Sequence, residues 1–305
     1  MENQHPQLQK SRQRRGLMLM LLGTICFSAK AVFVKLSYQY NIDAVSLMTL
    51  RMGISLPIYL LIGFFVLKGS QLSKLTLSDH LKIIAFGVAG YYLASLFDLL
   101  GLQYITAGFE RLILFLYPTI VLLISALFLK RSISRVEWCA LVLGYIGILI
   151  VYINDAQFVG EDVTVGMLWV LGSAVTFAIY IVGSGQMFAK IGTMGFTVYA
   201  MSAASVAILI HFSLTRPIES LDVVPELWMI AVIIAVFCTV IPTFLMAEGI
   251  KWLGAPQAAL VGCVGPGFTA LLAYLILGEV YTWVHFLGMV LVLSAVFVIG
   301  RNKGK

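Results

Sequence analysis

Long apolar runs, separated by short polar breaks, recur along the whole chain and constrain its fold more than any other feature. Of its 305 residues, 61% are hydrophobic and only 11% are charged, whereas a soluble domain has about 25% charged residues. A soluble chain this apolar would lack the polar side chains to cover its surface, whereas lipid would be a suitable outer solvent. About 20 apolar residues in a helix cross about 30 Å of hydrocarbon. The sequence therefore predicts an all-α integral membrane protein with ten transmembrane helices, at 17–37, 44–67, 82–104, 107–129, 136–153, 165–188, 194–214, 226–249, 255–277 and 281–300.

The distribution of Lys and Arg predicts the orientation of these spans. With a cytoplasmic N-terminus, 15 of the 20 basic residues fall in the tails and loops on the cytoplasmic side, and only Arg216 falls on the other side. Basic residues are enriched in cytoplasmic loops, so both termini are expected in the cytoplasm. Because the basic residues sit in short loops and not on one continuous face, a nucleic-acid partner is excluded. The short loops and the absence of a transit peptide favour a bacterial inner membrane.

The two halves of the chain carry a weak internal repeat. The segment "GFERLILFLYPTIVLLISALFLKR" aligns with "PQAALVGCVGPGFTALLAYLILGE" at an offset of 148, and nearer the start Gly16 aligns with Gly166 at an offset of 150. Each half has an odd number of predicted spans, so the second half must enter from the opposite side of the membrane, as in transporters that alternate their access. The predicted division is a cytoplasmic tail at 1–15, a first five-helix repeat at 16–153, an outer linker at 154–164, a second repeat at 165–300 and a cytoplasmic tail at 301–305.

Short motifs at equivalent places in the repeats resemble a known family. These are the "YP" and "GP" steps in the fourth and ninth predicted spans and the segments "FLKR" and "ILGE" that end them. With its two five-span halves, the chain resembles the EamA-type transporters of the drug/metabolite transporter superfamily over residues 16–300. The resemblance implies transport of a small metabolite, with helix pairs 3–4 and 8–9 moving against the rest, and it names no substrate.

Six charged residues converge on the outer half of the first repeat, from its first four spans. Ionisable groups inside a bilayer cost roughly 2.5–3.5 kcal/mol each and therefore mark functional sites or internal pairs. The six are Lys30, Lys35, Arg51, Asp98, Glu110 and Arg111.

Two interpretations of these charges remain open. In the structural one, Asp98 and Glu110 pair with Arg51 and Arg111, Lys35 extends to the interface, and Lys30 has no local partner. In the functional one, the surplus positive charge meets an anionic or zwitterionic substrate and a carboxylate exchanges protons. Lys30 and Asp98 are the residues favoured for such a role.

Two further sets complete the candidate site. Glu110 and Arg111 point about 100° apart on a helix, so at most one of them is expected to face a cavity directly. Tyr91, Tyr117 and Tyr180 lie deep enough in their spans to line a substrate site, whereas aromatic residues near span ends are interface anchors.

Prolines at equivalent positions predict bends in the fourth and ninth spans. Pro118 aligns with Pro266, which is flanked by Gly265 and Gly267. Proline removes a backbone donor and frees the carbonyl one turn earlier, so these four residues are expected to form a hinge or a cavity wall. A plain packing kink is the alternative.

The leading functional hypothesis is a secondary transporter for a small polar or amphipathic metabolite. There is no Walker A sequence, so direct coupling to ATP is not expected, and no cofactor or metal is expected because the Cys residues lack zinc-site spacing. The expected partners are a small-molecule substrate and the lipid bilayer, with protons as a candidate coupling ion and a monomer or homodimer as the assembly. The alternative is an intramembrane enzyme acting on a lipid-linked substrate, with Asp98 and Glu110 as an acid pair.

Overall fold

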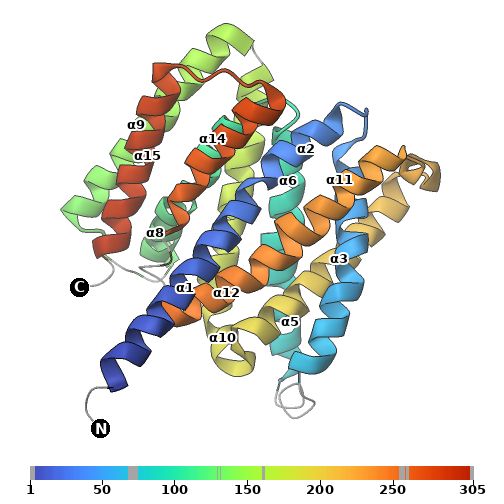
Figure 1. The fold of residues 1–305 in the computed structure, drawn as a ribbon, viewed down its shortest axis with the longest axis horizontal. Coiled ribbons are helices and arrows are strands. Elements are labelled where there is room, and N and C mark those ends of the chain that lie inside the picture. Colours follow the sequence, from blue (N-terminus) through green and yellow to red (C-terminus); the bar gives the residue numbers. More distant parts are fainter. Residues whose placement is uncertain are drawn as a thin grey trace.

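The chain folds into a bundle of long helices, as the computed structural model of residues 4–67, 75–128, 130, 132–159, 162–253, 258 and 261–302 shows (Figure 1). All regular secondary structure in these residues is helical, which confirms the predicted all-α class. Eight helical segments are long and apolar enough to cross a membrane: Gln13–Tyr38, Ala44–Val66, Leu77–Gly101, Ala107–Phe128, Arg135–Gln157, Asp162–Gly185, Met187–Thr215 and Pro225–Leu253. Two further apolar helices, at the predicted ninth and tenth spans, are shorter: Val264–Leu277 and Trp283–Ile299.

Four of these eight segments are built from more than one helix. The elements in chain order are α1 (Gln4–Ser28), α2 (Lys30–Tyr38), α3 (Ala44–Val66), α5 (Leu77–Gly87), η1 (Val88–Leu93), α6 (Ala94–Gly101), α7 (Ala107–Leu114), α8 (Tyr117–Phe128), α9 (Arg135–Val159), α10 (Asp162–Thr215), η2 (Ile218–Leu221), α11 (Pro225–Ala235), η3 (Val236–Val240), α12 (Ile241–Leu253), α14 (Val264–Leu277) and α15 (Trp283–Asn302). Within α10, Gly192 has a φ of 73°, which lets the chain turn between two spans because glycine adopts positive φ without a steric cost.

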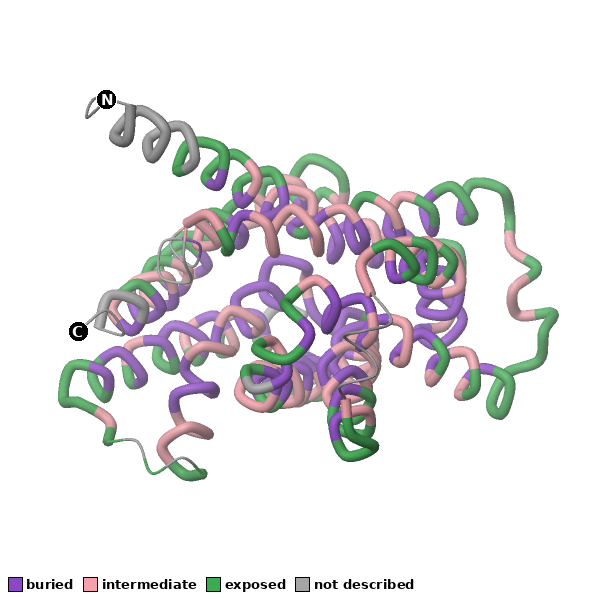
Figure 2. The backbone as a smooth tube through the Cα atoms, turned by 90° about the horizontal axis from the view of Figure 1, so that it is seen from below, coloured by how far each residue is buried: buried purple, intermediate pink, exposed green. Residues whose placement is uncertain are grey.

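Apolar side chains occupy both the inside and the outside of the bundle. Phe64, Phe65 and Leu127 are largely exposed, whereas Met48 and Leu99 are buried in a core that joins helices from both halves of the chain. Exposed turns and buried turns alternate along the outer helices (Figure 2). Exposed apolar surface on this scale would aggregate in water, and in a bilayer it contacts acyl chains.

Glycine contacts relate the two halves through the repeat register. A Cβ added at Gly16 would lie 2.8 Å from Trp252 Cβ, and one added at Gly166 would lie 2.8 Å from Tyr104 Cβ. Gly16 aligns with Gly166, and Tyr104 aligns with Trp252. The first helix of each half therefore packs closely on the third helix of the other half, α1 on α12 and α10 on α6.

The helix irregularities also occur at equivalent places. The π-helical segment η1 begins at Val88, and the π-helical segment η3 begins 148 residues later at Val236. The break between α7 and α8 includes Phe115, and the turn before α14 falls at its equivalent, Cys263. The third, fourth and eighth predicted spans are therefore interrupted rather than continuous helices. π-Helical segments often mark functional sites, and these ones flank the charged residues.

A buried charged cluster as the candidate functional site

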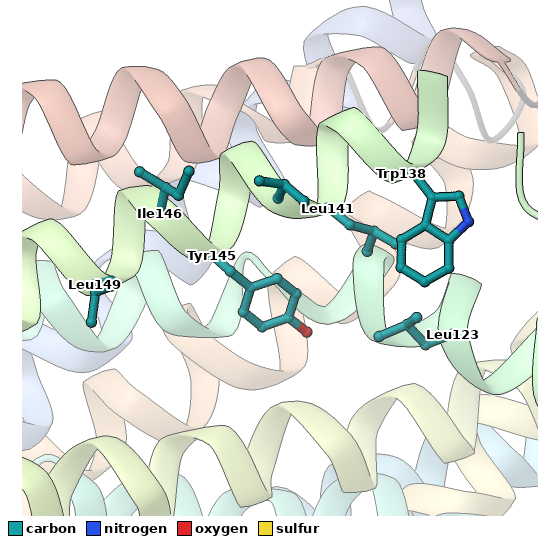
Figure 3. A pocket seen from close by; sticks show the side chains of 7 residues that line it. Leu123, Trp138, Leu141, Tyr145, Ile146 and Leu149 are labelled. Carbon is teal, nitrogen blue, oxygen red and sulfur yellow. The ribbon is translucent and has the colours of Figure 1, made fainter. Parts of the chain in front are cut away.

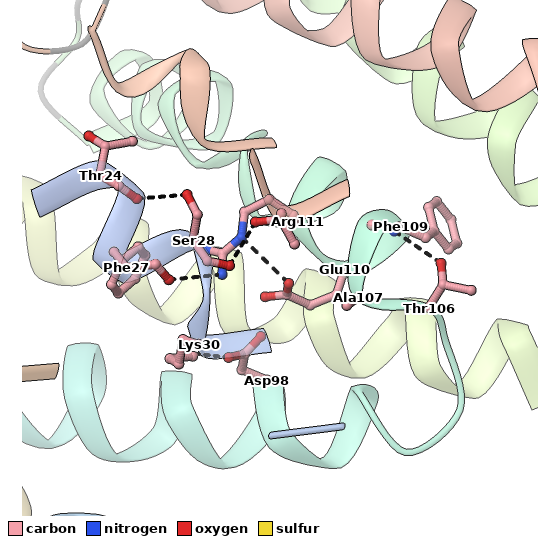
Figure 4. A network of polar contacts seen from close by, with 12 residues as sticks. Thr24, Phe27, Ser28, Lys30, Asp98, Thr106, Ala107, Phe109, Glu110 and Arg111 are labelled. Carbon is pink, nitrogen blue, oxygen red and sulfur yellow. Dashed lines mark hydrogen bonds and ion pairs between the residues drawn. The ribbon is translucent and has the colours of Figure 1, made fainter. Parts of the chain in front are cut away.

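Lys30 and Asp98 form a buried ion pair at the centre of the site. Lys30 Nζ lies 2.6 Å from Asp98 Oδ2, and the two residues are only 6% and 1% exposed. Lys30 begins α2 directly after the break at Ala29, and Asp98 lies in α6 beyond η1 (Figure 4). The prediction that Lys30 has no local partner is wrong, because depth along single helices does not tell how α2 approaches α6.

Glu110 and Arg111 form a second buried pair beside the first. Arg111 Nε lies 3.7 Å from Glu110 Oε2, and the Arg111 guanidinium sits 5.0 Å from the ring centroid of Phe27. Both charged side chains are almost fully buried. Both lie in the protein interior because α7 is buried from Ala107 to Ile113. The expectation that at most one of them faces a cavity directly stays a prediction.

Lys35 reaches the segment that joins α6 to α7. Its Nζ donates hydrogen bonds to the carbonyl oxygens of Ile105 at 2.7 Å and Leu102 at 3.4 Å. These carbonyls follow α6, where a helix end leaves acceptors without intrahelical partners. They belong to the segment between the third and fourth spans, and the extension of Lys35 to the interface stays a prediction.

Arg51 is a cation of the cluster with unpartnered donors. It lies in α3, is 2% exposed, and its Nε and Nη2 atoms have no hydrogen-bond partner among the described residues. The charge of Asp98 acts on it, but Asp98 Oδ2 is hydrogen-bonded to Lys30. With Lys30 set against Asp98 and Arg111 against Glu110, the positive charges of Arg51 and Lys35 remain, and Lys35 donates to backbone carbonyls.

The three predicted tyrosines come together in an aromatic group next to the π-helical segment η1. The hydroxyl groups of Tyr91 and Tyr180 are 2.9 Å apart. The ring of Phe177 lies between those of Tyr117 and Tyr180, and its centroid is 5.3 Å from the Tyr117 centroid and 5.6 Å from the Tyr180 centroid. The fold therefore joins tyrosines from both halves of the chain, and their role in binding stays a prediction.

The predicted hinge residues lie just after the helix breaks. Pro118 is in the first turn of α8, and Gly265, Pro266 and Gly267 are in the first turn of α14. Both glycines keep negative φ, since the positive-φ glycines among the described residues lie elsewhere. Proline fits the first turn of a helix without a lost bond, so the chain bends immediately before these residues. Their motion stays a prediction.

Glu279 is a functional candidate that the structure adds to the predicted site. Its Oε1 accepts a hydrogen bond from the Ala107 amide at 2.8 Å, and its Oε2 accepts from the Gly108 amide at 3.4 Å and from the Tyr281 hydroxyl at 2.7 Å. It therefore caps α7, the helix that carries Glu110, from the other half of the chain. The repeat register sets Glu279 against Arg131, which lies outside the described residues, and gives no signal for this contact.

A second contact of this kind joins His285 to Asp155. His285 Nε2 lies 2.9 Å from Asp155 Oδ1, and both residues are buried. Asp155 lies in α9 and His285 in α15, and these two helices pack against each other around the contact. The sequence offers no signal, because the two residues are 130 positions apart.

Comparison with known proteins identifies the family. The model of the EamA-like transporter family matches residues 14–153 and again residues 164–301. This chain belongs to the EamA-like transporter family. Its two matches correspond to the two halves that the glycine contacts relate.

Relatives of this EamA-like protein are named as transporters. The uncharacterized transporter YcbK of Bacillus subtilis is 28% identical over 270 residues, which cover 87% of this chain and 86% of YcbK. The uncharacterized inner membrane transporter YicL of Salmonella typhimurium is 22% identical over 292 residues, 95% of this chain and 96% of YicL. A protein solved by crystallography shares the fold, with a TM-score of 0.65 over 95% of this chain and 99% of that one, at 16% identity.

A hollow on the outward side of α9 is chemically different from the charged cluster of this EamA-like protein. Figure 3 shows its lining, which consists of apolar and aromatic side chains: Leu123, Trp138, Leu141, Val142, Tyr145, Ile146 and Leu149. Trp138 and Val142 are more than half exposed. The hollow therefore faces lipid and is almost entirely apolar, with the Tyr145 hydroxyl and the Trp138 indole nitrogen as its polar side-chain atoms.

Proposed function

We propose that this EamA-like protein is a secondary transporter of a small polar or amphipathic metabolite, anionic or zwitterionic, which works by alternating access. The supporting observation is that the buried charged cluster has polar atoms without hydrogen-bond partners among the described residues. They include Nε and Nη2 of Arg51, Oδ1 of Asp98 and both carboxylate oxygens of Glu110. A buried polar group without a partner costs free energy. A solute with an anionic group would satisfy Arg51, and one with an ammonium group would satisfy Asp98.

The relation between the halves supports alternating access. If α14 and α15 cross the membrane as the longer helices do, the chain has ten spans in two inverted halves, with both termini in the cytoplasm of a cell with an inner membrane. The equivalent contacts of Gly16 and Gly166 show that each half makes the same kind of packing. Exchange of the two halves' shapes would then open the cluster to either side, with bending at Pro118 and at Gly265–Gly267.

Protons are the candidate coupling ion. Asp98 and Glu110 are electrostatic neighbours in the bundle interior, and two buried carboxylates close together are poorly stabilised when both are charged. Asp98 is paired with Lys30 at 2.6 Å, so Glu110 is the better site for an exchangeable proton. This moves the expected coupling role from Asp98 to Glu110.

The test is uptake of a mixed metabolite pool into proteoliposomes, read by mass spectrometry with and without an imposed pH gradient. Selective accumulation of one class of solute is expected, and a gradient effect that disappears in Glu110→Gln would support proton coupling. An Arg216→Lys variant, changed at an exposed arginine, controls for preparation effects. Absence of selective uptake in either vesicle orientation, from protein shown to be folded, would contradict the transporter proposal.

A further inference from the structure

The two unpartnered donors of Arg51 lie on the same edge of its guanidinium group. The atoms without partners among the described residues are Nε and Nη2. In arginine these two nitrogens form the side of the fork that holds a carboxylate with two parallel hydrogen bonds. Burial of this edge, in a residue that is 2% exposed, leaves it without bulk water as a substitute partner.

A neighbouring hydroxyl group on the same helix is also available. Tyr59 lies two turns beyond Arg51 in α3, is fully buried, and is within electrostatic reach of it. Its hydroxyl lies near Thr243 but has no hydrogen-bond partner among the described residues, and Thr243 Oγ1 donates its own hydrogen bond to the Thr239 carbonyl at 2.6 Å. Ser55 lies between the two on α3 and donates its hydroxyl hydrogen bond to the Arg51 carbonyl. The open donors on this part of α3 are therefore those of Arg51 and Tyr59.

The charge of the Arg51 guanidinium matches a ligand group with one negative charge. Lys30 is paired with Asp98 and Arg111 with Glu110, and Lys35 donates to backbone carbonyls, so Arg51 is the cation whose donors are open. A phosphate dianion would carry one charge more than Arg51 neutralises. A planar monoanion with two acceptors along one edge fits both the charge and the donors.

We infer that Arg51 binds the carboxylate group of the transported solute, with Tyr59 as an additional donor. This inference rests on the proposed function and narrows it to solutes with one carboxylate at the bound end. Because Asp98 is paired with Lys30, the two open donors on one edge of Arg51 are available to a ligand.

The test is thermal unfolding of the full chain in detergent with a panel of monocarboxylates, each compared with its primary amide. The panel covers aliphatic, 2-oxo, 2-amino and aromatic acids, and the amides keep the shape of each acid without its charge. At least one acid is expected to stabilise the protein in a saturable way, and its amide is not. Arg51→Lys keeps the charge but loses the fork and should weaken this binding about tenfold or more, and Arg51→Gln should abolish it. Arg216→Lys should leave the affinity unchanged.

The outcomes separate this inference from the proposed function. Equal affinity for an acid in the wild type and in folded Arg51→Gln would overturn the role of Arg51. Selective uptake of a solute without a carboxylate, not inhibited by any acid of the panel, would overturn the inference and leave transport standing. Arg51-dependent binding of an acid without any uptake would uphold the carboxylate site at Arg51 and overturn transport. Neither binding nor uptake by folded protein would overturn both.

Discussion

Lys30 Nζ lies 2.6 Å from Asp98 Oδ2, and this contact joins α2 to α6 in the interior of the bundle. The two residues are 68 positions apart, and each side chain is at most 8% exposed. The pair neutralises the cation that sequence reasoning had left without a partner. As a consequence Arg51, rather than Lys30, carries the charge that is free to meet a solute.

The Lys30–Asp98 pair should show strong coupling in a double-mutant cycle. Lys30→Met or Asp98→Asn alone leaves an uncompensated buried charge and is expected to cost roughly 3–5 kcal/mol of stability. The double variant should recover most of this loss, because no charge is left alone. Thermal unfolding of the three variants measures the coupling, and additive effects would mean that the two groups do not pair.

Close packing between the halves should make Gly166 intolerant of a side chain. A Cβ there would lie 2.6 Å from Ile105 Cγ2 and 3.0 Å from the Gly101 carbonyl oxygen, so Gly166→Leu should separate α10 from α6 and strongly lower the unfolding temperature. Gly185→Ala is the control, since no atom lies within 4 Å of its added Cβ. Similar unfolding temperatures for the two variants would contradict the packing.

The cap that Glu279 forms on α7 should matter for both stability and transport. Glu279→Ala removes the acceptors of the Ala107 and Gly108 amides, which is expected to cost about 1 kcal/mol. Glu279→Gln keeps one carbonyl acceptor and should be milder. Uptake and unfolding are measured beside Glu219→Ala, a change at an exposed loop residue. A larger loss of stability and uptake in Glu219→Ala than in Glu279→Ala would contradict a role for the cap.

Asp43 should add stability that depends on pH at the start of α3. Burial raises its pKa, but hydrogen bonds from Ser46 and Val45 and the charge of Arg216 outweigh this, and the pKa lies below its ordinary 3.8. Because the folded pKa is the lower one, the ionised carboxylate stabilises the fold above pH 3.8, and this contribution is lost as pH falls through the lowered pKa.

The measurement for Asp43 is the unfolding temperature of Asp43→Asn and of the wild type over a range of pH. The gap between the two proteins should be constant near neutral pH and should shrink in acid as the wild-type carboxylate takes up a proton. Asp222→Asn, changed at an exposed loop position, should track the wild type. A gap that widens in acid would contradict the sign of the shift.

Pro266 should affect the rate of transport more than the affinity. It lies in the first turn of α14, directly after the turn at Cys263. Pro266→Ala supplies a backbone donor that can extend the helix across that turn, so the maximal uptake rate should fall several-fold while the solute concentration for half-maximal uptake stays the same. Unchanged uptake kinetics would reduce the turn to a packing kink.

The sequence by itself determined the membrane class, the two related halves and the identity of the charged residues. Composition and span length depend only on local chemistry, and the repeat register is a property of the chain, so residues such as Gly16 and Gly166 could be aligned without a structure. The same holds for the depth of Tyr91, Tyr117 and Tyr180, which the fold brings into one group.

The pairing inside the cluster was decided only by the tertiary structure. Lys30 meets Asp98 across 68 residues, and Glu279 meets Ala107 across 172. Such contacts depend on how helices are broken, rotated and brought together, and one added residue in a π-helical segment changes the face that follows it. Depth along each helix was therefore enough to identify the charged residues. Which of their atoms lack a partner, such as Nε and Nη2 of Arg51, was decided by their arrangement in space.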